Sequence, residues 1–383
     1  DLEVQQSVER ELEGHRGACV VIDPRDGGII AAASSPAYDL RLMVPRLSDE
    51  MNAAYFGNRD YRNRFCGETY APGSTFKPVT ALAGLAAGVP AGMTYDCTGE
   101  FRLGEWRLRC SRRWGHGPET LRTALRDSCN PYFCALGDDI GTNALIRAAK
   151  SFGLGSVVGV DLPGEVRGVV PDGAWKKRVY GEGWYPGDLP QMSIGQGMLT
   201  VTPLQMACVA GAIATGRRVR PHFKRSVRED VDLGPLPYTA AQLRVVREGM
   251  VAVVNDPLGS GVKGGEGVVD ARGRKVTVAG KTGTTNDNSD GWFMAFTPGL
   301  IAGTWVGGEE RSIHFDRTNE GQGAAMALPI WATFIKRVYA DKTLPYRESD
   351  QFYYPAGFDP CDASTYQSTD VIEEYEDDSS WDN

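Results

Sequence analysis

The chain has 383 residues, of which 42% are hydrophobic and 23% are charged, and these values are ordinary for a soluble globular protein. The net charge of −8 is concentrated near the C-terminus, because the residues from Arg347 onward include eleven acidic side chains and one basic side chain. The preceding residues contain 40 basic and 38 acidic side chains, and a body so close to neutral gives no support for nucleic-acid binding.

The N-terminal part of the sequence predicts a helix and then a β-hairpin. Residues 1–10 follow a helical pattern. Apolar runs at 18–23 and 29–33 flank a cluster of Pro, Asp and Gly residues, which is typical of two antiparallel strands joined by a turn. Residues 36–70 are polar and predict a loop-rich segment. The sequence contains no run of about 18 apolar residues, so we expect neither a membrane span nor a signal peptide within it.

The middle of the sequence predicts helices separated by polar segments. A run of small apolar residues at 81–87 predicts a buried helix, and residues 101–109 predict a short β-hairpin. A helical pattern over 120–140 is interrupted at 127–131, and a further helix is expected over 143–152.

Beyond residue 160 a long loop region precedes two helices. Residues 161–200 are rich in glycine and proline and predict irregular structure. Residues 202–214 then predict a buried helix with a proline in its first turn, and residues 240–255 predict an amphipathic helix.

The C-terminal part predicts a group of strands and a final helix. Strands are expected over 276–284, 291–296 and 301–306, and Pro298-Gly299 favours a turn that makes the last two antiparallel. Residues 326–340 predict a helix. An early hairpin, late strands and helices between them predict an α/β sandwich, in which helices cover an antiparallel sheet that both ends of the chain complete.

The sequence predicts a single domain followed by a tail. We find no internal repeat, and we assign residues 1–345 to one domain with helical insertions. Residues 346–383 form an acidic segment that we expect to be solvated and flexible, because it combines high negative charge with few apolar runs.

Ser74 and Lys77 form the first candidate catalytic pair. They lie three residues apart, so they share one face if the stretch is the first turn of a helix, and Pro72 and Gly73 suit the approach to a helix start. A lysine buried at that position has a lowered pKa and can take the proton of the serine. A capping serine beside a surface lysine gives the same pattern by chance, so the meaning of this pair depends on partners elsewhere.

Two later segments supply such partners. Ser128 and Asn130 interrupt a helical pattern, as polar residues that line a cleft would. The segment Lys281-Thr282-Gly283-Thr284 ends a predicted strand, and its glycine allows a ligand backbone to lie close. The order Ser-x-x-Lys, Ser-x-Asn, Lys-Thr-Gly resembles that of the penicillin-recognising serine acyl transferases.

The resemblance extends over residues 3–340 and is strongest to the transpeptidase domain of penicillin-binding proteins. Residues 71–78 are similar to the active-serine segment of that domain. Asn63-Arg64, residues 114–117 and residues 187–197 resemble the monofunctional, elongation-type (class B) branch, whereas residues 281–308 and 327–331 look more like the bifunctional class A branch. The resemblance implies the β-lactamase and DD-peptidase type of α/β fold. No glycosyltransferase domain is expected in this sequence.

The chemistry of the groups predicts their roles in acyl transfer. Ser74 is the expected nucleophile, and Lys77 is its expected base. Ser128 has a hydroxyl that both accepts and donates, so it can relay a proton to the leaving amine. Asn130 offers an amide that can fix both Lys77 and the substrate peptide bond.

The end of the predicted strand supplies the binding groups. Lys281, with the hydroxyls of Thr282 and Thr284, would hold a terminal carboxylate. The main-chain N–H groups of Ser74 and Thr284 would form an oxyanion hole, in which one donor is worth about 3 kcal/mol.

The family resemblance implies a D-Ala-D-Ala stem peptide of peptidoglycan as acyl donor, an amine of a second stem peptide as acceptor, and covalent trapping of Ser74 by β-lactams. It also implies a glycosyltransferase partner, a position on the extracytoplasmic (periplasmic) face of the membrane, and an N-terminal membrane anchor outside this sequence. Three alternatives stay open at this point. They are a DD-carboxypeptidase, a non-enzymatic β-lactam sensor and a β-lactamase, although Glu165 does not lie in a segment that resembles the β-lactamase glutamate loop.

A second group of residues predicts a metal site beside the catalytic residues. Cys97, Cys110, His116 and Cys129 are separated by 13, 6 and 13 residues. Three thiolates and an imidazole suit tetrahedral zinc, and some elongation-type members carry a similar ligand set. The expected role of zinc is structural, whereas no cofactor is expected for catalysis. A disulfide between Cys97 and Cys110 is the alternative interpretation.

Overall fold

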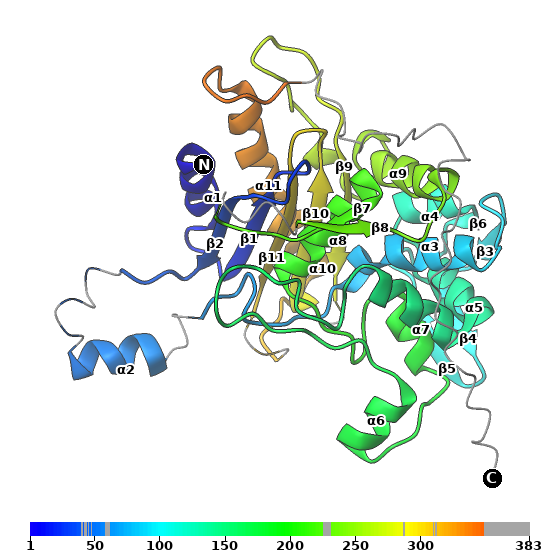
Figure 1. The fold of residues 1–383 in the computed structure, drawn as a ribbon. Helices are drawn as coiled ribbons and strands as arrows, with labels where there is room; N and C mark the ends of the chain where they lie inside the picture. The colour runs from blue at the N-terminus through cyan, green and yellow to red at the C-terminus, as the bar shows by residue number, and fades with distance from the viewer. Residues whose placement is uncertain are drawn as a thin grey trace.

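The computed structural model of the chain describes residues 1–39, 41, 44, 46, 48–57, 62–224, 231–285, 288–308, 310 and 312–347 (Figure 1). The predicted acidic tail lies outside the described residues from position 348 onward. The division into a domain and a tail therefore stays a prediction.

A five-stranded antiparallel sheet forms the centre of the molecule, with the order β2-β1-β11-β10-β9. Its strands are β1 (Gly17–Ile22), β2 (Ile29–Ser35), β9 (Ala279–Thr284), β10 (Asp290–Phe296) and β11 (Ile301–Gly307). The predicted hairpin and the late strands are confirmed, and β1 pairs directly with β11. The last strand in the order, β9, lies at an edge of the sheet.

The predicted strand over 276–284 begins three residues late, at Ala279. The reason is a local turn that uses the residues before it. The Val276 N–H donates to the carbonyl of Val268, and Lys275 forms an isolated bridge with Val269. The backbones of Lys275 and Val276 therefore pair with residues 268–269, and the pairing with β10 begins only at Ala279.

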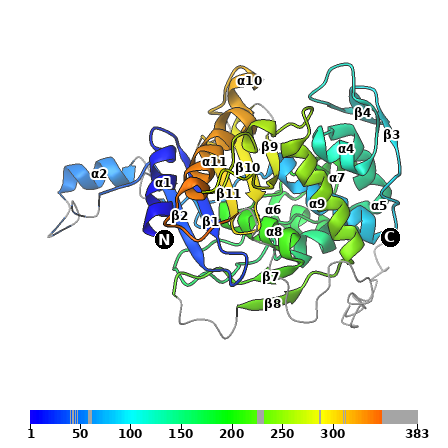
Figure 2. The ribbon, with the colours of Figure 1, turned by 90° about the horizontal axis from the view of Figure 1, so that it is seen from above.

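Helices cover both faces of the sheet (Figures 1 and 2). Alternate residues of β1 face opposite sides, as the period of two for a strand requires. Val20 belongs to a core that includes helix α8 (Pro203–Thr215), whereas Val21 belongs to a second core with α1 (Leu2–Leu12) and α11 (Gly323–Ala340). The structure thus confirms the predicted α/β sandwich.

A second group of helices lies beside the edge strand β9. It contains α3 (Lys77–Ala86), α4 (Leu121–Arg126), α5 (Asn130–Ser151) and α9 (Ala240–Asn255), which pack against one another and, through α9, against β9. Helix α5 is broken at Gly141, where φ is 77°, and this break separates the two helices that the sequence predicts there. The catalytic candidates lie where this helical group meets the sheet.

Short paired strands complete the fold. The predicted hairpin over 101–109 is confirmed as β4 (Glu100–Leu103) and β5 (Trp106–Arg109). Beside it, β3 (Tyr95–Cys97) pairs with β6 (Gly117–Glu119). Further elements are β7 (Arg217–Val219), β8 (Asp232–Pro235), α10 (Thr318–Gly321) and a 3₁₀ helix, η4 (Val262–Gly264).

Three helices lie in segments that the sequence predicts as loops. They are α2 (Asp49–Gly57), α6 (Gly173–Tyr180) and α7 (Asp188–Ser193). Helix α6 is defined by its ends rather than by an apolar face. The Asp172 carboxylate accepts the Trp175 N–H at its start, and Gly181 ends it with φ of 73°. Among the described residues, no helix has both the length and the apolar character needed to cross a membrane.

Candidate active site

Ser74 lies on a short turn that is held against the edge of the sheet. The turn is a 3₁₀ helix, η2 (Gly73–Phe76), and α3 begins at the next residue, Lys77. The Gly73 N–H donates to the carbonyl of Gly195 at 2.8 Å, and a Cβ atom at Gly73 would lie 2.7 Å from the Thr284 carbonyl oxygen. A glycine is required here because the backbone approaches β9 closely with φ of 54°.

Lys77 is fully buried and points from the start of α3 toward the α4–α5 connection. Its Nζ donates to the Ser128 carbonyl oxygen at 2.6 Å, to Asn130 Oδ1 at 2.7 Å and to Ser128 Oγ at 3.3 Å. Burial disfavours the ammonium form and lowers the pKa of Lys77 from 10.5 to about 8. The nearby cysteine side chains, with Cys129 and Cys110 first, favour the charged amine and oppose this shift, but burial is the larger effect.

Ser128 occupies the connection between α4 and α5 in a strained backbone conformation, with φ of 55°. Its hydroxyl oxygen accepts a hydrogen bond from Lys281 Nζ at 2.8 Å, in addition to the contact with Lys77. Lys281 is fully buried, and burial together with the nearby Lys77 amine lowers the pKa of Lys281 well below its ordinary value. A single hydroxyl thus lies between two amines from two separate parts of the chain.

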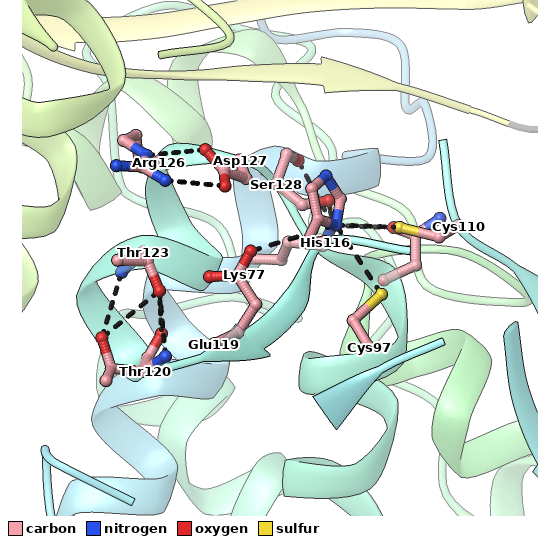
Figure 3. Close-up of polar contacts among 11 residues, drawn as sticks. Lys77, Cys97, Cys110, His116, Glu119, Thr120, Thr123, Arg126, Asp127 and Ser128 are labelled. Carbon is pink, nitrogen blue, oxygen red and sulfur yellow. Dashed lines mark hydrogen bonds and ion pairs between the residues drawn. The ribbon is translucent and has the colours of Figure 1, made fainter. Parts of the chain in front are cut away.

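The strained turn at Ser128 is held from both sides. The preceding Asp127 carboxylate accepts hydrogen bonds from the Arg126 guanidinium at 2.6 and 2.9 Å (Figure 3). The following residue, Cys129, belongs to the cysteine cluster described below. Strain of this kind costs about 1–3 kcal/mol and persists only where neighbouring contacts hold it.

The edge strand β9 carries the remaining candidates. Thr284 Oγ1 accepts the Gly323 N–H at 3.0 Å, and Thr282 Oγ1 lies 3.1 Å from the hydroxyl of Ser260. The sequence predicts a ligand backbone beside Gly283, but its close neighbour is the protein itself, because a Cβ there would lie 2.8 Å from the Pro72 carbonyl.

Ser260 is a site residue that sequence reasoning missed. It follows α9 in a loop that carries no recognisable pattern. The fold brings it to Thr282, and its N–H donates to the Arg126 carbonyl at 3.1 Å. Asn130, which sequence reasoning did find, is also tied to the hairpin because its Nδ2 donates to the Arg109 carbonyl at 3.1 Å.

The four predicted metal ligands converge at one point next to Ser128. One ligand atom from each of Cys97, Cys110, His116 and Cys129 lies within 4.8 Å of all the others. The imidazole points toward two of the sulfur atoms, with His116 Nδ1 at 3.4 Å from Cys110 Sγ and 3.7 Å from Cys97 Sγ (Figure 3). Cys97 and Cys110 are not joined by a disulfide in the part of the chain that the structure describes.

The chemistry of this cluster fits zinc. Hydrogen bonds from Cys129 and His116 favour the Cys110 thiolate and lower the pKa of Cys110 to about 3. The same thiolate raises the pKa of Cys129, since the neighbouring thiol then carries the shared proton. A tetrahedral zinc ion with bonds of about 2.0 Å to nitrogen and about 2.3 Å to sulfur places these two atoms about 3.5 Å apart. The separations of His116 Nδ1 from Cys110 Sγ and Cys97 Sγ, 3.4 and 3.7 Å, are close to this spacing.

Glu165, which the sequence offers as a candidate for a β-lactamase glutamate, holds a loop through its carboxylate. Its carboxylate accepts the main-chain N–H groups of Val158, Gly159 and Val160. Three N–H donors fix a carboxylate as a loop anchor. The position therefore gives no support for a water-activating role.

The geometry allows nucleophilic acyl transfer. Ser74 is the residue on the turn, Lys77 is a buried amine one turn away, and Ser128 offers a hydroxyl that two amines orient. The backbone of β9 runs along the same edge. Such an arrangement can move a proton from a serine to a leaving amine without a metal at the reacting atoms.

Comparison with known proteins agrees with this geometry. Residues 17–305 match the family described as the penicillin binding protein transpeptidase domain. Peptidoglycan D,D-transpeptidase MrdA of Escherichia coli K12 is 34% identical over 282 residues, which cover 69% of this chain and 44% of the relative. MrdA of Acinetobacter baumannii is 32% identical over 309 residues, which cover 76% of this chain and 44% of that protein. The chain thus spans less than half the length of these relatives.

Solved structures show the same likeness. PBP2 of Pseudomonas aeruginosa, determined in complex with WCK 5153, is 29% identical with a TM-score of 0.78, and the match covers 92% of this chain and 79% of that one. The Helicobacter pylori penicillin-binding protein PBP2, determined in complex with MreC, is 28% identical with a TM-score of 0.77 over 90% of this chain and 64% of the other. With the family match spanning most of the described sheet and helices, the chain belongs to the penicillin-binding protein transpeptidase domain family.

Proposed function

We propose that this chain catalyses peptidoglycan D,D-transpeptidation, with Ser74 as the nucleophile. The observation that carries the proposal is the position of Ser128 Oγ, 3.3 Å from Lys77 Nζ and 2.8 Å from Lys281 Nζ. Three segments that are distant in sequence meet at this hydroxyl. The hydroxyl of Ser128 and the amines of Lys77 and Lys281 can then pass a proton between one another, as acyl transfer to and from a serine requires.

In the first half-reaction, Ser74 Oγ attacks the carbonyl carbon of the penultimate D-Ala. Lys77 takes the serine proton, because burial keeps a useful fraction of its amine neutral. The C–N bond breaks, and Ser128 passes a proton to the leaving D-Ala amine. The main-chain N–H groups of Ser74 and Thr284 hold the oxyanion, while Lys281 and Thr282 hold the terminal carboxylate.

In the second half-reaction, the amine of another stem peptide attacks the ester carbon. A new C–N bond forms, the bond to Ser74 Oγ breaks, and the amine proton returns to Ser74 through Ser128 and Lys77. β-Lactams resemble the donor and acylate Ser74 in the same way. The contacts of Glu165 with three main-chain N–H groups favour this function over a β-lactamase.

Intact-mass measurement after benzylpenicillin tests the nucleophile. We expect one acyl adduct on the wild-type chain and none on Ser74→Ala. The matched control is Ser312→Ala, which removes an exposed hydroxyl far along the chain and should retain the adduct. An adduct on Ser74→Ala would overturn the assignment.

Turnover of a D-Ala thioester with and without an added amine separates the alternatives. A transpeptidase forms an amide in competition with hydrolysis. A DD-carboxypeptidase gives only hydrolysis, and a β-lactam sensor is acylated without turnover. Amide formation that disappears in Ser74→Ala is the expected result.

We also propose a structural zinc ion at Cys97, Cys110, His116 and Cys129. The convergence of four suitable donors supports it. When bound, zinc would supply a rigid tetrahedral link between the hairpin segment and the start of α5. Since Cys129 lies between Ser128 and Asn130, that link would fix both residues.

We propose further that the chain acts at the extracytoplasmic (periplasmic) face of the membrane, through an anchor outside this sequence, together with a glycosyltransferase. The likeness to H. pylori PBP2 in complex with MreC, and to a chain of a structure titled as a peptidoglycan synthase complex that coordinates polymerization and crosslinking, supports a role within an assembly. The branch assignment, class B for the earlier segments and class A-like for the later ones, stays a prediction.

A further inference from the structure

The β4–β5 hairpin has two chemically different faces, because alternate side chains of a strand point to opposite sides. The apolar side chains share one face and pack against the core that contains α5: Phe101, Leu103, Trp106 and Leu108. The opposite face carries Arg102, Arg107 and Arg109, and all three side chains are exposed. The hairpin is thus anchored through its apolar face and presents a row of arginines to solvent.

The positive charge of the exposed face is neutralised only in part. Arg102 and Arg107 lie directly opposite each other on the two paired strands, and like charges in this position destabilise a hairpin. Glu100 accepts a hydrogen bond from Arg102 Nε at 2.6 Å, whereas Arg107 forms no ion pair with any residue that the structure describes. An anion bound across this face would relieve the repulsion.

The segment after β5 adds two more arginines to the same region. Arg112 and Arg113 are both exposed, and a Cβ atom at Gly99, just before β4, would lie 2.3 Å from the Arg113 carbonyl oxygen. The Arg113 guanidinium lies 5.1 Å from the ring centroid of Trp114, which is 83% exposed. We call the five exposed arginines of residues 102–113 the arginine face: Arg102, Arg107, Arg109, Arg112 and Arg113.

The same chain contains a segment of the opposite charge. Residues 348–383 include eleven acidic side chains and no basic one. Five of the acidic side chains fall within the six residues 373–378: Glu373, Glu374, Glu376, Asp377 and Asp378. A short run of carboxylates therefore matches a short run of exposed guanidinium groups, and carboxylates can pair with guanidinium groups through two hydrogen bonds at once.

The acidic segment is long enough to reach the arginine face. It follows Arg347, which comes after α11, and α11 packs in the second core whereas the hairpin packs in the first (Figures 1 and 2). Glu373 lies 26 residues after Arg347, and an extended chain of that length spans about 85 Å. A folded body of about 350 residues is about 50 Å across, so the segment can pass around it.

We propose that the arginine face binds the acidic segment 348–383 of the same chain, chiefly through residues 373–378. A single exposed ion pair contributes little, but several pairs made by one tethered segment act together. Since Asn130 Nδ2 donates to the main-chain carbonyl of Arg109 at 3.1 Å, the bound segment lies beside the candidate active site. The inference goes beyond the proposed function and does not depend on it, because none of these arginines takes part in the proposed acyl transfer.

The test measures how a fluorescein-labelled peptide of residues 368–383 binds to the chain, by fluorescence anisotropy at about 50 mM salt. The wild-type chain is compared with a tail-neutralised chain, in which the acidic side chains of the run become amides: Glu373→Gln, Glu374→Gln, Glu376→Gln, Asp377→Asn and Asp378→Asn. We expect the tail-neutralised chain to bind the peptide about tenfold or more tightly than the wild type, because its own segment no longer competes. A salt concentration of about 0.5 M should remove most of the binding.

A pair of substitutions in the tail-neutralised chain locates the binding surface. Arg107→Gln with Arg113→Gln should weaken peptide binding about tenfold. Arg272→Gln with Lys275→Gln removes the same charge from exposed positions before β9 and should leave the affinity unchanged. Equal Tm values of the two double variants would show that both fold alike. Equal weakening by the two pairs would overturn the proposal, because the peptide would then respond only to net charge.

The comparison of the wild-type and tail-neutralised chains also identifies the occupant. Equal peptide affinities would overturn the proposal, since the wild-type segment would then leave the arginine face uncovered. A difference that grows with the concentration of the chain would assign the segment to the arginine face of a second copy and would also overturn it. These measurements involve no acylation, so their outcome is separate from that of the proposed function.

Discussion

Lys77 Nζ lies 2.6 Å from the main-chain carbonyl oxygen of Ser128 and 3.3 Å from its hydroxyl oxygen. One buried lysine therefore contacts both the backbone and the side chain of a residue whose φ is 55°. A change that relaxes this backbone conformation moves both contacts together. The position of the Ser128 hydroxyl is thus coupled to the conformation of the α4–α5 connection.

The first prediction concerns the pH dependence of acylation. Burial lowers the pKa of Lys77 to about 8, so the neutral amine, which is the proposed base, becomes the minor form below that pH. The second-order rate constant for acylation by nitrocefin should rise about tenfold per pH unit at acidic pH and level off above the pKa. Stopped-flow measurements between about pH 5.5 and pH 9.5 provide the profile.

The control for this prediction is a pair of lysine variants. Lys77→Met should remove the pH-dependent rise and slow acylation about 10³-fold or more, because the variant lacks the proposed base of Ser74. Lys150→Met changes an exposed lysine of α5 and should leave the profile unaltered. A rate constant that falls as the pH rises would exclude Lys77 as the base.

The second prediction concerns metal content. Protein purified without added zinc should contain about one equivalent, and Cys110→Ala should lose it, because the cluster then keeps only three donors. Removal of the metal by a chelator should lower the Tm, since metal binding and folding are coupled. Elemental analysis and calorimetry give the two readouts independently of activity.

Cys208→Ala is the matched control, because Cys208 lies on α8 outside the cluster. Its zinc content should equal that of the wild-type chain. A wild-type content below about 0.2 equivalents would end the zinc proposal.

The third prediction concerns the turn that carries Ser74. Gly195 has φ of 76°, and a Cβ atom there would lie 2.0 Å from the Gly73 carbonyl oxygen. Gly195→Ala should therefore lower the free energy of unfolding by about 2–4 kcal/mol and slow acylation, because Gly73 must move. Urea unfolding and acylation kinetics measure the two effects.

Gly14→Ala is the control for this variant. Gly14 has a similar φ of 78°, but nothing lies within 4 Å of the added Cβ. It should cost about 1–2 kcal/mol from backbone strain alone and leave acylation unchanged. Equal effects of the two variants on acylation would show that the contact with Gly73 does not position Ser74.

The fourth prediction distinguishes this chain from a hydrolytic β-lactamase. Glu165→Gln should destabilise the loop by about 1–2 kcal/mol, since the amide accepts the three N–H groups less strongly than the carboxylate. The lifetime of the benzylpenicilloyl enzyme should stay the same. A longer lifetime in the variant, followed by intact mass over time, would instead assign Glu165 to deacylation.

The sheet could be predicted from the sequence because it rests on local patterns, whereas the candidate site needed the order of three separate motifs and their resemblance to a family. Apolar runs define β1, β10 and β11, and the spacing of Ser74 and Lys77 follows from one helical turn. The fold also brings together the three cysteines and the histidine that the sequence predicts as a metal site. The strands and the Ser74–Lys77 spacing need no knowledge of long-range packing.

The features that the sequence could not reveal depend on long-range contacts. The sequence of helix α6 has no regular spacing of apolar residues that would predict a helix. Its capping Asp172 and its terminal Gly181 are helix-end signals from which the helix could have been predicted. The positive φ of Ser128 has no local cause, because serine gains nothing intrinsically from that conformation. Ser260 reaches Thr282 only through the folded loop after α9.

The pairing of β1 with β11 has a consequence for the folding of the chain during its synthesis. A chain that emerges from its N-terminus first produces the hairpin of β1 and β2 early, but a lone hairpin is only marginally stable in water. The five-stranded sheet cannot form until β9, β10 and β11, which come from the far end of the domain, have been synthesised. Such non-local pairing slows folding. Because Lys281 lies on β9, the proposed acyl transfer and the proposed acylation by β-lactams both require that synthesis of the domain is almost complete.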